Sequence, residues 1–283
     1  MKRSNWPLVA LLAVAVVLAL ILGLTQPAGS AVTPSAGVET YNTAVCGSAY
    51  VPVDLGRGDY ENVYNAPDGS TCVTAERHRA WWYVSDTNGT DGWNYPNISS
   101  GIEWGKYTCY DGRSALASSP GSRCMRYPVR EDRDGDPVTG IGHVWPHLAR
   151  GNVSYDIWFN KTDIAPAALR QNDGAEIMVW LQHPGVPLAN YRILWTARIG
   201  GHAYDVTGWT AHRNGVTWLY TAYIAVHPMT SMPRTKLNEF FANAIEHGRL
   251  SARWWLTSVN FGEEILAGGD GFAVRGYTLG GIR

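Results

Sequence analysis

The sequence has 283 residues and a formal net charge of −1, and 45% of its residues are hydrophobic. A chain of this length can bury a sizeable core within one large all-β domain. The near-zero net charge gives no electrostatic reason to expect nucleic acid as a partner. With 13 Trp and 15 Tyr against 5 Phe, most aromatic residues have both a flat apolar face and a hydrogen-bonding edge, which suits sugar rings.

Residues 1–31 have the layout of a secretory signal peptide. A basic start, Met1–Arg3, precedes the uncharged run Leu8–Leu24, and small residues follow with expected cleavage after Ser30 or Ala31. The uncharged run is slightly long for a signal and slightly short for a membrane span, so an uncleaved N-terminal anchor is the alternative. With either outcome, we expect the rest of the chain to be secreted or otherwise extracytoplasmic.

Residues 32–44 contain mostly small and polar residues and are expected to form a short tether before a folded domain at 45–283. An exported chain with four cysteines is expected to form two disulfides. Three pairings exist in principle, and closeness in sequence favours pairing the first with the second and the third with the fourth. Each such loop stabilises a fold by roughly 3 kcal/mol. The four residues are Cys46, Cys72, Cys109 and Cys124.

Short β-like runs separated by turn residues follow from 45 to 130, which favours antiparallel strands over βαβ units. The acidic run 131–136 does not fit a calcium loop, because Pro137 stands where that loop needs Gly. His143 and His147 are four residues apart, but Pro146 disrupts the helix that would align them. We therefore expect no metal site and no cofactor.

Two runs further along the chain alternate between apolar and polar residues, as half-buried strands do. In 153–160, Asp156 and Trp158 lie on the face opposite the aliphatic and aromatic core residues. In 174–181, Glu176, Met178 and Trp180 lie opposite an aliphatic face. A buried carboxylate is costly unless it is paired or functional. If the two strands pair as an antiparallel hairpin, Asp156 lies near Glu176 on the floor of a cleft.

The remaining pattern predicts strands at 191–195, 203–206 and 216–226, and then one helix at 234–248 that Thr235 caps and Gly248 follows. A strand at 253–265 precedes a last strand at 272–279. Alternation along 253–265 places Glu264 on its polar face and Glu263 on its apolar face.

Three of these runs resemble glycoside hydrolase family 12, the small β-1,4-glucanases of concanavalin-like jelly-roll fold. They are Ser154-Tyr155-Asp156-Ile157-Trp158, Glu176-Ile177-Met178-Val179-Trp180, and Leu256–Val259 continuing into Gly262-Glu263-Glu264. Cys46 and Cys72 match the N-terminal disulfide of that family. The resemblance implies an all-β sandwich of two antiparallel sheets with one helix packed on the outer sheet, and it makes 45–283 a catalytic domain.

By this resemblance, Glu176 is the nucleophile of a retaining mechanism, Glu264 is the general acid/base, and Asp156 orients the nucleophile. Retention needs the two carboxyl groups roughly 5–5.5 Å apart. Ionised Glu176 at that range is expected to raise the pKa of Glu264. The residues expected to contact the sugar chain are Tyr64, which stands where the family has a tryptophan, and Trp158, Met178, Trp180 and Asn260.

The activity that the resemblance implies is internal hydrolysis of cellulose-like or mixed-linkage β-glucan by a monomer. Neither nucleic acid nor an obligate protein partner is expected. Two alternatives remain open: a xyloglucanase or xylanase of the same architecture, and a catalytically silent, lectin-like glucan binder. At the level of single residues, Asp156 is alternatively a structural acceptor, and Trp158 and Trp180 alternatively pack within the sheet.

Overall fold

The computed structural model describes backbone and side chains for Tyr95, Asn97 and residues 138–146, 148–162, 172–213, 215–268 and 272–279. For 44–46, 50–54, 60–64, 72–76, 81–85, 98–103, 106–107, 129–130 and 280 it describes the strand backbone alone.

The described part of the chain is almost entirely β-structure. Its N-terminal strands are β1 Ala44–Cys46, β2 Tyr50–Asp54, β3 Tyr60–Tyr64, β4 Cys72–Glu76, β5 Trp81–Ser85, β6 Asn97–Glu103, β7 Lys106–Tyr107 and β8 Val129–Arg130. Its later elements are β9 Val138–Ile141, β10 His143–Trp145, β11 Leu148–Asn160, β12 Ala175–Gln182, the 3₁₀ turn η2 Leu188–Asn190, β13 Trp195–Ile199, β14 His202–Arg213, β15 Val216–Ala225, β16 Met232–Lys236, α2 Asn238–Glu246, β17 Trp255–Gly268, β18 Ala273–Arg275 and β19 Thr278–Gly280.

Among the described residues, eleven of these strands form one sheet, which we call the large sheet. Its order is β13-β14-β15-β12-β11-β17-β6-β3-β2, with β7 and β8 attached to β6 and β17. The predicted antiparallel pairing of 153–160 with 174–181 is confirmed as β11 against β12. The pair β12–β15 is parallel, an arrangement that the antiparallel prediction did not include.

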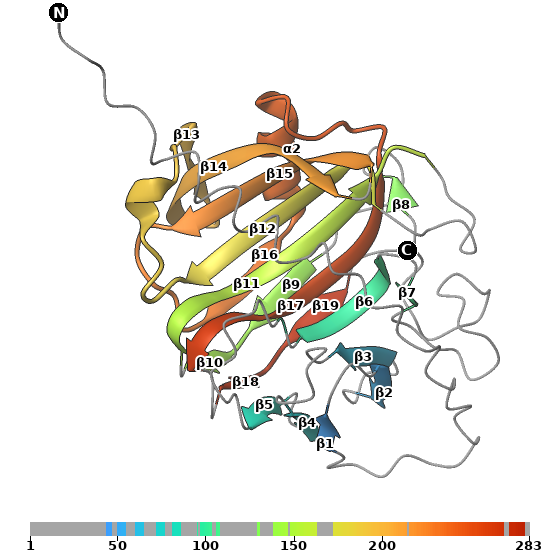
Figure 1. Ribbon diagram of the computed structural model, residues 1–283, viewed down its shortest axis with the longest axis vertical. Coiled ribbons are helices and arrows are strands. Elements are labelled where there is room, and N and C mark those ends of the chain that lie inside the picture. The colour runs from blue at the N-terminus through green and yellow to red at the C-terminus, as the bar shows by residue number, and fades with distance from the viewer. Residues whose placement is uncertain are drawn as a thin grey trace, which may run out of the picture. The chain divides into compact units, whose positions relative to one another are not determined.

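A hydrophobic core fills the space between one face of the large sheet and two smaller sheets, β1-β4-β5-β18-β10 and β16-β9-β19. Tyr155 and Ile157 of β11 enter this core from the large sheet, and Ile141 of β9 enters it from the other side. A bond of 2.7 Å between the hydroxyl groups of Thr139 and Tyr155 links the two layers. Figure 1 shows β9, β16 and β19 drawn behind the strands of the large sheet. The predicted all-β sandwich is therefore confirmed.

The helix α2 packs against the core face of the large sheet, and this corrects the expected packing on the outer sheet. Phe241 of the helix meets Phe159 of β11 edge-on at 4.9 Å between ring centroids. The Tyr223 hydroxyl of β15 donates to the carbonyl of Phe240 over 3.1 Å. The helix begins at Asn238, later than predicted, because the segment around Thr235 pairs with β9 as β16.

The helix therefore lacks the predicted threonine cap, and the Thr235 hydroxyl instead donates to the carbonyl of Pro233 over 2.7 Å. Its other end is as predicted: Gly248 follows the helix with φ 68°, a conformation that favours glycine.

Two predicted strands differ in the structure. Residues 191–194 of the expected strand 191–195 are irregular, since they follow the η2 turn, and β13 begins only at Trp195. The expected last strand at 272–279 is two strands, β18 and β19. Gly276 lies between them with φ 72°, a left-handed conformation that interrupts extended backbone.

Several predictions lie outside the described residues: the signal or anchor at 1–31, most of the tether at 32–44, both Cys109 and Cys124, and the side chain of Tyr64. For the first cysteine pair the backbone is described, and the register of β1 with β4 places Cys46 directly opposite Cys72. Within the described residues, no helix is both long enough and apolar enough to cross a membrane.

Candidate active site

Three carboxylates from three neighbouring strands lie on the face of the large sheet that is turned away from the main core. Trp158 of β11 is opposite Glu176 of β12, and Asn152 of β11 is opposite Glu264 of β17. Asp156 shares the face of Trp158 because side chains two residues apart in a strand point the same way. We call this surface the carboxylate face.

Glu176 and Glu264 lie on opposite sides of β11 and at different heights along it. The residue of β11 opposite Glu176 is Trp158, whereas the residue opposite Glu264 is Asn152, nearer the start of the strand. The register of β11 with β12 shifts at Val153/Ser154, between these two partners, and the register with β17 shifts at Arg150/Gly151, just before Asn152. Such bulges bend strands and increase their twist. Gly151 has φ 146°, and a Cβ there would overlap the carbonyl oxygen of Glu264, so this bend requires glycine.

Glu264 is half-buried, and burial raises the pKa of its carboxyl group to about 7. The Asn152 side-chain amide donates a short hydrogen bond to Oε2 of Glu264, which acts in the opposite direction and lowers the pKa. The expected direction of the shift is therefore found, but its cause is burial rather than the charge of Glu176. A carboxyl group with this pKa is protonated in a large fraction of molecules at neutral pH.

Glu176 has a different environment, in which an indole N–H faces the carboxylate. Trp218 of β15 donates from Nε1 to Oε2 of Glu176 over 2.6 Å. On the neighbouring strand, Trp158 donates from Nε1 to Oδ2 of Asp156 over 3.0 Å. The two tryptophan rings are 5.7 Å apart and tilted by 51°. An indole can only donate, so both bonds favour the ionised form of the acid that they reach.

The pKa of one phenol, that of Tyr220, is affected by the charges of all three acids. Burial, followed by the charges of Glu264, Glu176 and Asp156, raises the pKa of Tyr220 well above its usual range. Charge–charge energies fall with distance, so all three carboxylates are close enough for their charges to act on this hydroxyl group. The Tyr220 hydroxyl donates to Sδ of Met178 over 3.2 Å.

The residues predicted to contact sugar lie on the carboxylate face but form its floor. Trp158, Met178 and Trp180 are buried, and Asn260 is buried as well. Trp180 donates from Nε1 to the sulfur of Met178 over 3.4 Å. Their role in binding sugar stays a prediction, as does that of Tyr64, for which the structure describes only the backbone, in strand β3.

Sequence reasoning missed four residues of the site: Asn152, Trp218, Tyr220 and Tyr191. Burial, the charge of Glu264 and the opposing charge of Arg150 set a raised pKa for Tyr191, which places its phenol near the acid. Alternation along 216–226 already put Trp218 and Tyr220 on one face. The parallel register that brings this face to Glu176 has no signal in the sequence.

Glu263 lies on the other side of the sheet from Glu264, as alternation predicted. Its side chain has no exposed surface, and neither carboxylate oxygen has a hydrogen-bond partner. Burial raises the pKa of Glu263 well above its usual range. The two adjacent acids therefore differ: Glu264 reaches the carboxylate face, and Glu263 lies within the core, where burial favours its neutral form.

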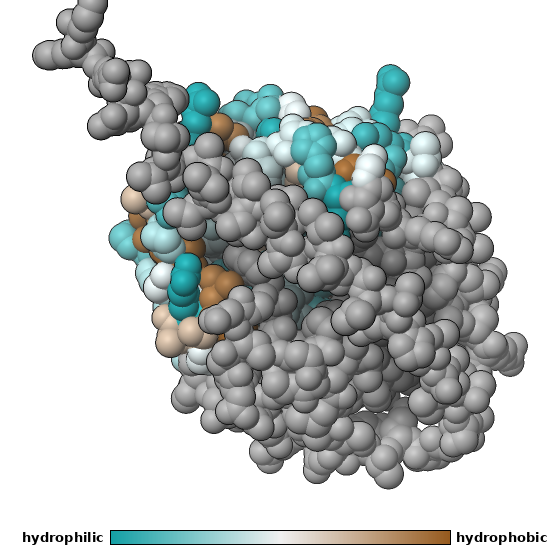
Figure 2. Space-filling view, viewed as in Figure 1, coloured by the Kyte–Doolittle hydropathy of each residue, from teal (hydrophilic) through white to brown (hydrophobic). Residues whose placement is uncertain are grey.

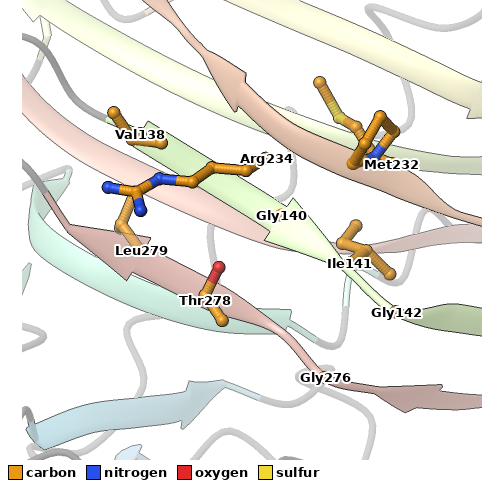
Figure 3. Close-up of a pocket in the computed structure, with 10 residues that line it drawn as sticks. Val138, Gly140, Ile141, Gly142, Met232, Arg234, Gly276, Thr278 and Leu279 are labelled. Atoms are coloured by element: carbon orange, nitrogen blue, oxygen red, sulfur yellow. The ribbon is translucent and has the colours of Figure 1, made fainter.

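A separate cavity of about 410 Å³ lies on the three-stranded sheet, bounded by β9, β16 and β19. Figure 3 shows Arg234 of β16 extended over it beside Val138 and Leu279. Its described lining residues include no carboxylate, so it is distinct from the candidate active site. Across the described residues, no cluster of three or more His, Cys, Asp or Glu side chains forms a potential metal site.

Comparisons with known proteins bear on this arrangement. Residues 146–280 match the family model described as Glycosyl hydrolase family 12, a range that includes all three acids. Endoglucanase S from Pectobacterium parmentieri is 25% identical over 194 residues, which cover 68% of this chain and 66% of that protein. The chain thus matches slightly less than two thirds of the length of this relative.

Solved structures agree in fold. Endoglucanase cel12A from Rhodothermus marinus superposes with a TM-score of 0.65 at 22% identity, over 84% of this chain and 98% of that one. The native family 12 xyloglucanase from Bacillus licheniformis superposes with a TM-score of 0.65 at 18% identity, over 84% of this chain and 100% of that one. The part of the chain that matches glycosyl hydrolase family 12 is therefore residues 146–280, which contain all three acids.

Proposed function

We propose that this protein is a secreted, retaining endo-β-1,4-glucanase that cuts internal bonds of cellulose-like or mixed-linkage β-glucans. The observation that carries the proposal is the contrast between two acids on one face of the large sheet. Glu264 has a pKa near 7, set by burial, whereas Glu176 receives an N–H donor from Trp218. One carboxyl group is thus suited to give a proton, and the other to act as an anion.

In the proposed first step, the Glu176 carboxylate attacks the anomeric carbon while Glu264 protonates the departing glycosidic oxygen. A covalent glycosyl-enzyme ester forms at Glu176, and the glycosidic C–O bond breaks. In the second step, Glu264, now ionised, takes a proton from water. That water attacks the anomeric carbon and releases Glu176 with retention of configuration.

Asp156 and Trp158 support the anionic side of the site in this proposal. Trp158 donates to Asp156 and lies 5.7 Å from the ring of Trp218, which in turn donates to Glu176. The two indoles thus link the two acids through packed side chains. Residues in such a network hold the nucleophile in position without themselves reacting.

The choice of glucan rests on similarity to named endoglucanases, and a family 12 xyloglucanase has the same fold. The test is hydrolysis of carboxymethyl cellulose, barley β-glucan, xyloglucan and xylan by the purified chain, read as new reducing ends and as loss of viscosity. Rapid viscosity loss on the first two substrates supports internal cutting of β-1,4-glucan. Preference for xyloglucan or xylan, or binding without hydrolysis, would replace the proposal with one of its alternatives.

The roles of the two acids are tested by Glu176→Ala and Glu264→Ala, with Glu246→Ala at the exposed end of α2 as the matched control. Each site variant is expected to lose at least about 1,000-fold in kcat, since removing a member of a catalytic pair costs several kcal/mol. Proton NMR of the first-formed product should show the β-anomer. An α-anomer would contradict the double displacement.

A further inference from the structure

Among the residues whose side chains are described, one large aromatic side chain on the carboxylate face remains substantially exposed. Trp209 of β14 is 46% exposed, whereas Trp158 and Trp180 are buried. A tryptophan has a flat apolar face and a hydrogen-bonding edge, a combination that suits a sugar ring.

The register of three adjacent strands fixes the position of Trp209 relative to the acids. Trp209 is directly opposite Tyr220 of β15, which is directly opposite Glu176 of β12. The three side chains therefore form one row across the sheet on one face. Two interstrand spacings amount to about 10 Å, so Trp209 lies beyond the residues that touch the reacting sugar.

The exposed ring is held by its neighbours. Trp209 stacks on Tyr220 at 4.1 Å between centroids with an interplanar angle of 29°. Tyr191, whose phenol feels the charge of Glu264, is 6.4 Å from Trp209. These contacts make the surface around Trp209 continuous with the candidate active site.

The backbone beneath Trp209 is also fixed, from the opposite face of the sheet. The Arg249 guanidinium donates from Nη2 to the carbonyl of Trp209 over 2.7 Å and to the carbonyl of Tyr220 over 2.6 Å. The neighbouring Gly208 leaves room for this contact, because a Cβ there would lie 3.0 Å from Nη2 of Arg249. A surface that is rigid before binding loses less conformational entropy when a ligand arrives.

We propose that Trp209, backed by Tyr220 and Tyr191, is a stacking subsite for a hexose of the bound β-glucan, separated from the bond that is cut by at least two rings. The proposal rests on the proposed function, because it takes the carboxylate face to bind a glucan chain. β14 lies toward the opposite end of the large sheet from β3, so this subsite is distinct from the one expected at Tyr64. Figure 2 shows brown hydrophobic residues among teal hydrophilic ones on the left and at the top of the described surface.

The test compares Trp209→Ala with wild type and with Thr210→Ala. Thr210 is the next residue, is exposed, and points to the opposite face, so it is a matched control. We expect Trp209→Ala to raise KM for cellohexaose by about tenfold, a typical value for one aromatic stacking contact. KM for an aryl β-cellobioside, which is too short to reach the subsite, should change less than about twofold.

Two further measurements keep the test decisive. Trp209→Tyr retains a flat ring and should recover most of the affinity even if the alanine variant folds poorly. End-labelled cellohexaose should be cut at a different position by Trp209→Ala, because one binding register has lost its anchor. If Trp209→Ala and wild type have equal KM and equal cleavage patterns, the subsite is disproved while the proposed function stands. If wild type neither cuts nor binds any β-glucan, the proposed function itself fails.

Discussion

The indole N–H of Trp218 is 2.6 Å from Oε2 of Glu176 and donates a hydrogen bond to it. The bond exists because β15 pairs with β12 in parallel, an exception in a sandwich of mainly antiparallel strands. An indole has no acceptor, so it stabilises the carboxylate and not the carboxylic acid. The geometry thus makes Trp218 a positioning residue for the proposed nucleophile.

Replacing Trp218 with Phe should lower kcat/KM by about 10- to 100-fold, because a hydrogen bond to a charged group contributes about 1.5–3 kcal/mol. The loss should fall mainly on kcat, since the bond aligns a reacting group. Without the donor, Glu176 is protonated more readily, so the acid limb of the pH–activity profile should move to higher pH. Steady-state kinetics between pH 4 and 8 measure both effects.

Trp195→Phe is the matched control, because Trp195 also donates from its indole, to Oδ1 of Asn243 in α2 over 2.9 Å. This bond lies away from the carboxylate face, so its loss should lower the melting temperature and leave the pH profile in place. If both variants show the same activity and the same profile, Trp218 has no special role at Glu176.

The pKa of Glu264 gives a second prediction. The proposed acid must be protonated before cleavage, so kcat/KM should fall as pH rises through about 7. The hydrogen bond from Asn152 favours the ionised form and lowers this pKa. In Asn152→Ala, the alkaline limb should therefore move upward, by about 1 pH unit if the lost bond contributes about 1.4 kcal/mol. A downward or absent shift would contradict the assignment of Glu264 as the acid.

Glu263 gives a prediction about stability rather than activity. Its pKa is raised in the folded state, so the folded chain holds a proton that the unfolded chain releases above the ordinary value of 4.5. Stability from this group is thus complete below that pH and is lost as pH rises, by about 1.4 kcal/mol per pH unit until the folded pKa is reached. The isosteric Glu263→Gln has no proton to lose, so it should be more stable than wild type at pH 7.

Urea unfolding at pH 4 and pH 7 measures this difference. The two proteins should have nearly equal free energies of unfolding at pH 4 and diverge at pH 7. If their stabilities change in parallel between these two values, Glu263 is not the buried neutral acid that the structure places in the core.

Much of the site follows from alternation alone. The pattern in 153–160 and 174–181 predicted both strands, their pairing, and the shared face of Asp156 and Glu176. The same alternation separated Glu263 from Glu264, which the burial of Glu263 confirms. These predictions succeed because a strand with one face in the core has its register fixed by side-chain hydrophobicity.

The groups that modify the acids could not be predicted in this way. Asn152 reaches Glu264, and Trp218 reaches Glu176, across strand pairs that are distant in sequence. Those contacts depend on bulges in β11 and on the parallel β12–β15 pair, which change which residues stand opposite one another. Similarly, Thr235 has the chemistry of a helix cap, but the β16–β9 pairing takes that residue into a strand.

The bulge at Gly151 gives a last prediction. An alanine there would adopt an unfavourable φ of 146°, and its Cβ would also overlap the carbonyl oxygen of Glu264. Gly201→Ala separates these two costs, because Gly201 has φ 84° and open space where the Cβ would be. Conformational strain alone should cost Gly201→Ala about 1–2 kcal/mol of stability and no activity.

Gly151→Ala should cost more, about 2–4 kcal/mol, since backbone must move as well. Because β17 must shift to make room, Glu264 should move relative to Asn152, and kcat/KM should fall in the molecules that remain folded. Thermal unfolding and kinetics measured well below the melting temperature distinguish the two effects. Equal losses of stability in the two variants, with full activity in both, would mean that the bulge does not position the acid.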